Sequence, residues 1–353
     1  MIGLIYADTR RRLARKNIPR EVQPLLVKIT MHSRLTLNSM AKALKKHNVN
    51  YYKAEIGDWF HDCDYAILWG YRRVVGYDGK LRWRFLDKLA KKKIRPMIIE
   101  LGYLRRYSMW GSGYNADGES YFGVGWDGLN GRADFCNKDC PPDRFEKLGI
   151  PIKPWRENGD HILVCGQAYY DSSLFHLLRR PETKDKFFEM QGTGFPYGSL
   201  YIDWIIETLK KIRKHSDRKI VFRHHPKIGK LYKNTPVFSY CSGAIKHCGV
   251  ENVEISPMGG PTGNIRNVNE DYKNCWAVVC FNSNSGVEAT LNGIPTFVGD
   301  VGSMAWDVAD KDLSKIENPS YKERDQWAHN LAYCQWTVNE MKQGLPLKHL
   351  GVL

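Results

Sequence analysis

Short apolar runs alternate with amphipathic stretches throughout the first part of the chain. The runs predict strands over residues 2–6, 49–52, 64–70 and 96–99. Between them, apolar side chains recur at helical spacing, as at Leu37, Ala41 and Leu44, and again at Phe85 and Leu89. Strands that alternate with helices indicate a parallel sheet with right-handed crossovers. The first half is therefore predicted to be Rossmann-like.

The same alternation returns after a stretch rich in proline and polar residues between positions 141 and 160. Apolar runs predict strands over residues 161–166, 219–227, 252–256, 276–281 and 296–298. A last amphipathic helix is expected from Trp327 to Val338. We therefore expect an α/β fold with an N-terminal Rossmann-like domain over 1–158, a second over 159–320 and a terminal helical segment over 321–353.

Length and composition agree with two globular domains. The chain has 353 residues, of which 42% are hydrophobic and 26% charged. No apolar run is long enough to span a bilayer, and residues 1–6 are too short and too quickly followed by polar residues for a signal peptide. We expect a soluble, cytoplasmic protein.

Cysteine usage does not indicate a disulfide framework. The nine cysteines are odd in number and scattered, and Cys136 and Cys140 form the one close pair of interest. No second pair at zinc-site spacing accompanies them. The thiols are interpreted as reduced and structural, with a metal at Cys136 and Cys140 as the alternative.

The formal net charge of +15 favours a polyanionic partner, which could be nucleic acid, an anionic membrane surface or an acidic glycan. Part of this charge lies in Arg10, Arg11 and Arg12, directly after the first predicted strand. That position belongs to the carboxyl edge of a parallel sheet, where ligands bind in open α/β folds. The cluster is interpreted either as a solvated loop or as an arm that grips phosphates.

A stretch rich in glycine and aromatic residues follows the fourth predicted strand and extends to Phe135. Long loops in compact domains are commonly binding elements. Aromatic faces with arginines between them suit a sugar ring or an extruded base, although the same residues could simply cover the sheet. The candidate acceptor-binding residues of this stretch are Arg105, Arg106, Trp110, Tyr114 and Trp126.

The most informative stretch begins where the strand over 276–281 ends. Small polar residues follow, and a short helix begins at Ser285 or Gly286 and is closed by Pro295. A strand, a small polar loop and a helix N-terminus form a natural anion site, and Glu288 could accept hydrogen bonds from ribose hydroxyls. The alternative is an ordinary N-capped helix. The candidate phosphate-binding residues are Ser283, Asn284, Ser285 and Gly286.

Two other predicted strands end in polar residues. Gln167, Ser172 and Ser173 follow the strand over 161–166. The strand over 219–227 ends in Arg223, His224, His225 and Lys227, of which Arg223, His225 and Lys227 resemble a phosphate clamp.

The order of these motifs resembles GT-B glycosyltransferases. Gly166-Gln167 with Asp171-Ser172-Ser173, then His225-Pro226, then Ser285-x-x-Glu288-Ala289 with Gly293-x-Pro295 is similar to bacterial capsular Kdo transferases and, more loosely, to sialyltransferases. The resemblance implies two Rossmann-like domains with parallel sheets facing across a cleft. It also implies a nucleotide-sugar donor, with its phosphate on Ser283, Ser285 and His225 and its ribose on Glu288.

The family uses a carboxylate as general base at an acidic pair before a glycine. Here that turn reads Glu100-Leu101-Gly102, so its second position departs from the family. Glu100 is our first candidate for the base, followed by Asp127 and Asp8. We identify no Asp-x-Asp metal motif and therefore expect no metal and no cofactor, which suits stabilisation of the leaving phosphate by protein cations alone. Analogy with the family favours inversion.

The acceptor is the least defined part. The charge and the aromatic loop narrowly favour DNA containing hydroxymethylated pyrimidine, as in phage-type DNA glycosyltransferases. A lipopolysaccharide or capsular glycan, anionic and sometimes lipid-linked, is the alternative, because many enzymes that act at anionic membranes are also basic. A non-catalytic nucleic-acid-binding protein and a sugar-nucleotide epimerase remain as other hypotheses.

Overall fold

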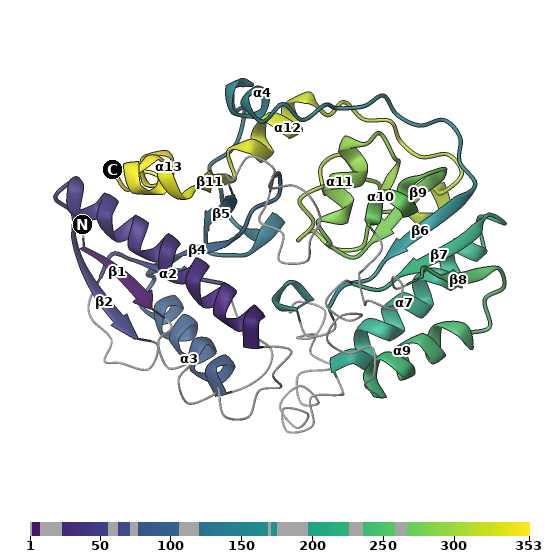
Figure 1. The fold of residues 1–353 in the computed structure, drawn as a ribbon, viewed down its shortest axis with the longest axis horizontal. Coiled ribbons are helices and arrows are strands. Elements are labelled where there is room, and N and C mark those ends of the chain that lie inside the picture. The colour runs from purple at the N-terminus through teal and green to yellow at the C-terminus, as the bar shows by residue number, and fades with distance from the viewer. Residues whose placement is uncertain are drawn as a thin grey trace. The chain divides into compact units, whose positions relative to one another are not determined.

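The computed structural model describes residues 2–7, 23–55, 63–70, 77–105, 120–168, 171–174, 197–225, 236–257 and 267–353. The chain divides into two units (Figure 1). The first contains Met1–Gly149 and Ala328–Leu353, and the second contains Ile150–Trp327. The boundaries expected from the sequence, after residues 158 and 320, lie near these divisions.

The first unit is built on a six-stranded sheet in the order β11-β5-β4-β3-β1-β2. Its strands are β1 (Ile2–Ala7), β2 (Asn50–Glu55), β3 (Tyr65–Trp69), β4 (Arg95–Leu101), β5 (Tyr121–Trp126) and β11 (Gln335–Thr337). Its helices are α2 (Gln23–Lys46), α3 (Tyr77–Lys91), α4 (Asp143–Leu148), α13 (Val338–Gln343) and α14 (Leu345–His349), with α12 (Asp325–Ala332) at the division between the units. A short 3₁₀ turn, η2 (Asn130–Arg132), follows β5.

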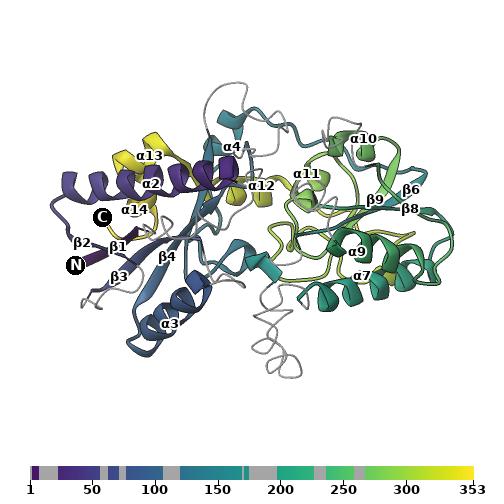
Figure 2. The ribbon, with the colours of Figure 1, turned by 60° about the horizontal axis from the view of Figure 1, so that its bottom comes forward.

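Alternate residues of the central strands supply two separate cores. Ile67 and Trp69 of β3 lie with the apolar face of α2, whereas Ala66 and Leu68 lie with Phe85 of α3. This follows from the alternation of side chains along a strand. Figure 2 accordingly shows α2 and α3 on opposite faces of the sheet.

Two predictions for the first unit are wrong. The four predicted strands pair in parallel, but the predicted loop that extends to Phe135 contains a further strand, β5, which pairs antiparallel with β4 and with β11. Residues 121–126 are therefore a buried strand instead of part of a loop. The last predicted helix is also interrupted, because residues 335–337 pair with β5 and end the helical pattern that began at Trp327.

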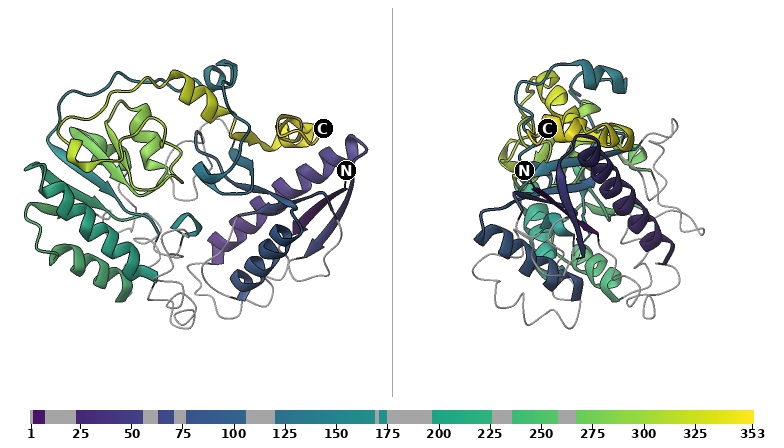
Figure 3. Two further views of the ribbon diagram at one scale, coloured as in Figure 1. Left: turned by 180° about the vertical axis from the view of Figure 1, so that it is seen from behind. Right: turned by 90° about the vertical axis from the view of Figure 1, so that its left-hand side faces the viewer.

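The second unit has a five-stranded parallel sheet in the order β10-β9-β6-β7-β8. Its strands are β6 (His161–Cys165), β7 (Lys219–Arg223), β8 (Val253–Ile255), β9 (Cys275–Cys280) and β10 (Thr296–Val298). Its helices are α7 (Tyr197–Arg213), α9 (Pro236–Lys246), α10 (Val268–Tyr272) and α11 (Ser285–Leu291), with 3₁₀ turns η3 (Ser172–Leu174) and η6 (Leu313–Lys315). Figure 3 shows α7 and α9 side by side.

The prediction of an α/β fold with two Rossmann-like domains is confirmed. Each unit has parallel strands joined through helices, and the strand order reverses once in each sheet. None of the helices in the described ranges combines the length and apolar character needed to cross a lipid bilayer.

Candidate functional site

The strand order of the second sheet reverses between β6 and β9. From β6 the chain proceeds through β7 to β8 on one side, and then returns to β9 and β10 on the other. The chain therefore leaves β6 and β9 toward opposite sides of the sheet. In open α/β sheets, such a reversal leaves a crevice above the carboxyl ends of the two strands. The loops that begin at Gly166 and Phe281 lie at this reversal.

A pair of side-chain amides joins these two loops. Gln167 Nε2 donates to Asn282 Oδ1 at 2.7 Å, and the Asn282 backbone N–H donates to Gln167 Oε1 at 2.9 Å. Gln167 Nε2 also donates to Ser173 Oγ at 2.9 Å. Both amide residues are buried, being 6% and 4% exposed. Gln167 and Ser173, both predicted to bind the nucleotide-sugar donor, are thus brought together. The Gln167 side chain, however, forms its hydrogen bonds with other protein groups.

Asn282 extends the network in two further directions. Its Nδ2 donates to Ser173 O at 2.9 Å and to Asp300 Oδ1 at 3.0 Å, after β10. The Gln167 backbone N–H donates to Tyr201 Oη of α7 at 2.9 Å. The sequence did not single out Asn282, Asp300 or Tyr201, because their partners are distant along the chain.

Helix α10 joins the end of β7 to the first turn of α11. Asp271 forms a buried ion pair with Arg223 and accepts hydrogen bonds from Ser256 Oγ at 2.9 and 3.0 Å. The next residue, Tyr272, donates from its hydroxyl to Ser285 O at 2.9 Å. The predicted phosphate ligand Arg223 is therefore charge-compensated, and Asp271 fixes its position.

The first turn of α11 is stabilised by its own loop. Ser283 Oγ accepts the Ser285 backbone N–H at 3.3 Å, and Asn284 Nδ2 donates to Glu288 Oε1 at 3.3 Å. A Cβ on Gly286 would lie 3.0 Å from Cys280 Sγ, so glycine lets this turn approach β9 closely.

The Ser285 hydroxyl turns inward. Its oxygen is buried and makes no hydrogen bond of ordinary geometry within the described ranges. It lies instead near the Cys165 and Cys280 thiols, and burial raises the pKa of Cys165 to about 11 although the Ser285 hydroxyl opposes that shift. This orientation differs from the predicted one, in which the Ser285 side chain holds phosphate.

Glu288 lies close to the same group of residues. Burial raises the pKa of Tyr272 well above its ordinary value, and the Glu288 carboxylate adds to the shift. The same carboxylate also raises the pKa of Cys165. Glu288 is only partly buried, so it combines proximity to the reversal point with access to solvent.

The two adjacent histidines after β7 lie in different surroundings. His224 is 1% exposed, its Nε2 lies 3.0 Å from Ser242 Oγ, and burial lowers its pKa to about 4. His225 is partly buried. His224 is thus a neutral core residue, and of the two histidines only His225 reaches the surface.

The Gly-x-Pro end of the motif has a structural role. Gly293 has a φ of +72°, and a Cβ there would collide with Pro154 O. Arg324 donates to Thr290 O at 2.6 Å and to Lys153 O at 2.7 Å, which links the end of α11 to the strand-like segment before β6. A backbone crossing of this closeness requires glycine.

In the first unit, Glu100 is near the carboxyl end of β4 and is partly buried. Its Oε1 accepts the Leu101 backbone N–H at 3.1 Å. The following turn is fixed by Gln335 of β11, whose Oε1 accepts the N–H groups of Tyr103 and Leu104 at 2.7 and 2.8 Å. Glu100, the first candidate for the base, therefore directly precedes a turn whose backbone is fixed by hydrogen bonds to Gln335.

Asp127 and Trp126 do not share this location. Because β5 is antiparallel to β4, Glu100 pairs with Gly123, while Trp126 lies beside Met97 at the opposite end. Asp127 forms an ion pair with Arg95 at 2.6 Å. Asp127 cannot serve one site together with Glu100, and we do not retain it as a base.

Trp126 is a core residue, and its predicted contact with an acceptor is not retained. It is 6% exposed, its indole Nε1 donates to Leu350 O at 3.2 Å, and its ring packs edge-on against Tyr65. Arg105 is partly buried, with a left-handed φ of 41°. Several other candidates lie outside the described residues, namely Asp8, Arg10, Arg11, Arg12, Arg106, Trp110, Tyr114 and Lys227, as does the side chain of Ser172.

Within the described ranges, no group of three or more His, Cys, Asp or Glu side chains could hold a metal ion. Cys136 is exposed and Cys140 is buried. The chain contains two Asp-x-Asp sequences that the expectation of metal independence left out of account, at 62–64 and 310–312. In the second, Asp310 accepts the Ser320 N–H at 2.7 Å and Asp312 caps η6, so both serve local loops.

No protein-family model matches the sequence, and no curated protein matches it. Among solved structures, the chain is similar to the beta Kdo 2,4 transferase of Thermosulfurimonas dismutans KpsC, with a TM-score of 0.49 and 11% identity over 96% of this chain and 97% of that one. The beta Kdo 2,7 transferase of the same protein gives 0.42 and 13%, over 99% and 100%. A UDP-GlcNAc 2-epimerase from Methanocaldococcus jannaschii gives 0.29 and 13%, over 93% and 96%. At these values the functional proposal rests on the residues of this chain.

Proposed function

We propose that this protein is a GT-B glycosyltransferase that moves a sugar from a nucleotide-sugar donor to a hydroxyl acceptor. One observation carries the proposal. The carboxyl ends of β6, β7 and β9 are joined by side-chain bonds, through Gln167 with Asn282 and through Asp271 and Tyr272, at the reversal of strand order. Open α/β sheets bind nucleotides at such a reversal.

The structure changes the roles assigned within this site. Gln167, Ser173 and Asp271 position the loops, and Arg223 is held by Asp271. Glu288 remains the ribose ligand of the proposal, because a partly exposed carboxylate can accept bonds from two vicinal hydroxyls. We keep His225 and Lys227 in the proposal as the residues that supply positive charge toward phosphate, and the loop backbone at 283–286 as a donor of N–H groups.

The proposed reaction is a displacement at the anomeric carbon. A carboxylate takes the proton of the acceptor hydroxyl, the new glycosidic bond forms, and the nucleotide leaves with the bonding electrons. Glu100 is the proposed base. Inversion is proposed by analogy with the family, and metal independence is proposed because protein cations can stabilise the leaving phosphate.

Two acceptors remain in the proposal. DNA with hydroxymethylated pyrimidine is favoured by the net charge of +15 and predicts tight duplex binding that weakens steeply with salt. A lipopolysaccharide or capsular glycan predicts turnover with that acceptor and no duplex binding at low salt. The same two measurements separate the hypotheses.

The donor site is tested by thermal stabilisation with free UDP, GDP, CMP and dTDP. We expect one of them to raise the melting temperature, and Glu288→Gln to weaken its binding about tenfold or more, since a hydrogen bond to a charged group contributes about 1.5–3 kcal/mol. Glu270→Gln is the matched control, because Glu270 is an exposed carboxylate of the same unit and forms a solvent-exposed ion pair with Lys273. No stabilisation by any nucleotide would contradict the proposal.

Catalysis is tested separately by Glu100→Gln. An enzyme that uses Glu100 as its base should lose most of kcat while its nucleotide affinity is unchanged. A non-catalytic nucleic-acid-binding protein would show no turnover in either form. An epimerase would convert the donor sugar in the absence of any acceptor.

A further inference from the structure

One surface of the first unit combines exposed lysines with exposed apolar side chains. It lies where the end of α2 meets the turn between α13 and α14, and we call it the α2–α13 corner. Figures 1 and 2 both show α13 beside α2. Its exposed lysines and leucines are Lys42, Lys45, Lys46, Lys342, Lys348, Leu345 and Leu353.

Specific contacts hold these elements together. His47 directly follows the two lysines that end α2, and its Nε2 lies 3.3 Å from Gln343 O. A Cβ on Gly344 would lie 3.3 Å from His47 Nε2 and 2.8 Å from Leu353 Cδ1. Leu345 and Leu353 are each 37% exposed. The lysines of α2 and the leucines after α13 are therefore neighbours.

The side chains of the corner carry no negative charge. Neither α2 nor residues 341–353 contains an Asp or Glu. Within the described ranges none of its five lysines forms an ion pair. The one acidic residue of α13, Glu340, is bound by Arg144 at 2.7 Å. Lysines at a helix end are favoured by the helix dipole, but that effect does not explain the absence of acidic residues or the exposed leucines.

A comparison with α7 shows that a lysine-rich helix end need not be so one-sided. Lys210 and Lys211 also lie in a last helical turn, but α7 carries Asp203 and Glu207 as well. At the start of the following strand, Lys219 pairs with Glu254. The positive charge of α7 is thus partly offset by acidic residues of the same helix, whereas that of the α2–α13 corner is not.

We propose that the α2–α13 corner attaches the protein to an anionic lipid surface. Lysines extend apolar stems and place point charges among lipid headgroups, and neighbouring leucines can enter the headgroup boundary. The corner has no exposed arginine for bidentate contacts to bases or phosphates, and a nucleic acid would leave the leucines without a partner. This attachment goes beyond the proposed transfer reaction, and it favours the glycan acceptor over DNA.

The test is co-sedimentation of the full chain with vesicles of phosphatidylcholine alone or mixed with phosphatidylglycerol. We expect binding only to the mixed vesicles and its release by salt. Lys45→Gln with Lys46→Gln should weaken binding by about fivefold per lysine. Leu345→Ser should also weaken it without any change in charge.

The matched control is Lys210→Gln with Lys211→Gln, which removes the same charge from α7 and should leave vesicle binding unchanged. Nucleotide stabilisation should be unaffected in every variant, so failure here is distinguishable from failure of the glycosyltransferase proposal. Equal weakening by the control pair, or absence of binding to the mixed vesicles, would overturn the inference. So would corner-dependent binding of duplex DNA without binding of vesicles.

Discussion

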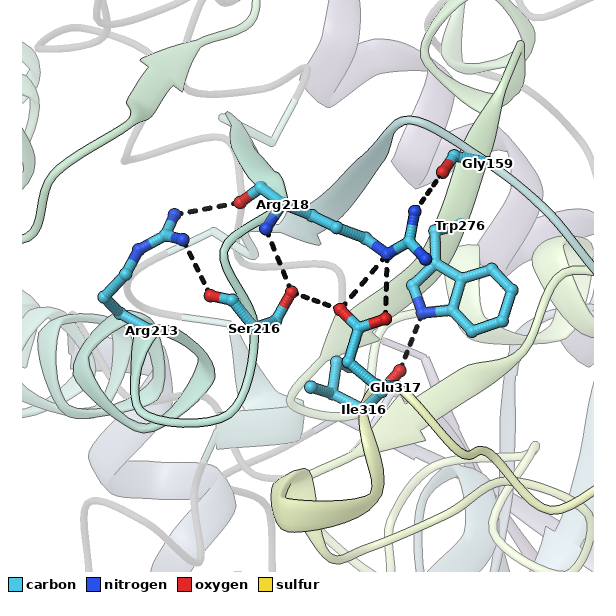
Figure 4. Close-up of polar contacts among 7 residues, drawn as sticks. All are labelled: Gly159, Arg213, Ser216, Arg218, Trp276, Ile316 and Glu317. Carbon is cyan, nitrogen blue, oxygen red and sulfur yellow. Dashed lines mark hydrogen bonds and ion pairs between the residues drawn. The ribbon is translucent and has the colours of Figure 1, made fainter.

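The two edges of the second sheet use polar side chains differently. At the amino edge, Arg218 Nε donates to both carboxylate oxygens of Glu317, and Arg218 Nη1 donates to Gly159 O (Figure 4). The Arg218 guanidinium lies 4.5 Å from the centre of the Trp276 ring. Ser216 donates to the same carboxylate. These side chains form hydrogen bonds with one another and with nearby backbone at this end of the sheet.

At the carboxyl edge, the polar side chains instead connect one loop to another. Asn282 joins the loops after β6, β9 and β10, and Asp271 fixes Arg223 at the end of β7. Glu288 remains partly exposed among them. A polar network by itself therefore does not identify a binding site. A site requires a network that positions loops while a chemically useful group stays accessible.

The largest effect is expected from Asp271→Ala, which leaves Arg223 buried without its counter-ion. Breaking a buried pair from one side costs about 3–5 kcal/mol of unfolding free energy, measurable by denaturant titration. Glu254→Ala is the control. Glu254 pairs with Lys219, which lies on β7 like Arg223, but this pair is about half exposed and should contribute little. Equal losses in the two variants would contradict a special role for the buried pair.

The next effect concerns pH and His224. Burial lowers the pKa of His224 from 6.5 to about 4, so the unfolded chain binds the proton more tightly. The stability that depends on neutral His224 is therefore present above pH 6.5 and lost as the pH falls toward 4, by about 3 kcal/mol. His224→Gln should show a shallower fall between these pH values in denaturant unfolding. An unchanged slope would show that other groups control acid sensitivity.

Asn282→Ala should have an intermediate effect on stability and a distinct effect on binding. It removes the Oδ1 acceptor of Gln167 and the Nδ2 donor to Ser173 O and Asp300, at a cost of about 1–3 kcal/mol. Because only the bond from the Asn282 backbone N–H then remains of those that join the loops after β6 and β9 within the described ranges, nucleotide affinity should fall as well, as measured by calorimetric titration of the folded variant. Tyr201→Phe, which removes the acceptor of the Gln167 backbone N–H and leaves both Gln167–Asn282 bonds in place, should lose less affinity.

The smallest effect is expected at the amino edge. Glu317→Gln removes the charge that pairs with Arg218, at a site about one third exposed, and should cost about 1 kcal/mol. Nucleotide affinity should be unchanged, because this edge takes no part in the proposed site. A loss of affinity comparable to that of Asn282→Ala would remove the distinction between the two edges.

Local patterns were sufficient to predict most of the strands and the loop from Asn282 to Glu288. Long-range pairing was not predictable in this way. The helical pattern from Trp327 continues past residue 335, but three residues there pair with β5, and this pairing overrides the local periodicity. Asp271, Tyr272 and Gln335 act on groups distant along the chain or in another element, and no local pattern identifies such partners.

The most direct test of a donor site at the carboxyl edge of the second sheet is hydrogen exchange measured by mass spectrometry, with and without the stabilising nucleotide. We expect the nucleotide to slow exchange in the segments around Gln167, Arg223 and Ser283–Glu288. Exchange around Gly159 and Ser216–Arg218 should be unchanged and serves as the internal reference. Protection confined to the amino edge, or to the first unit alone, would contradict a donor site at the carboxyl edge of the second sheet.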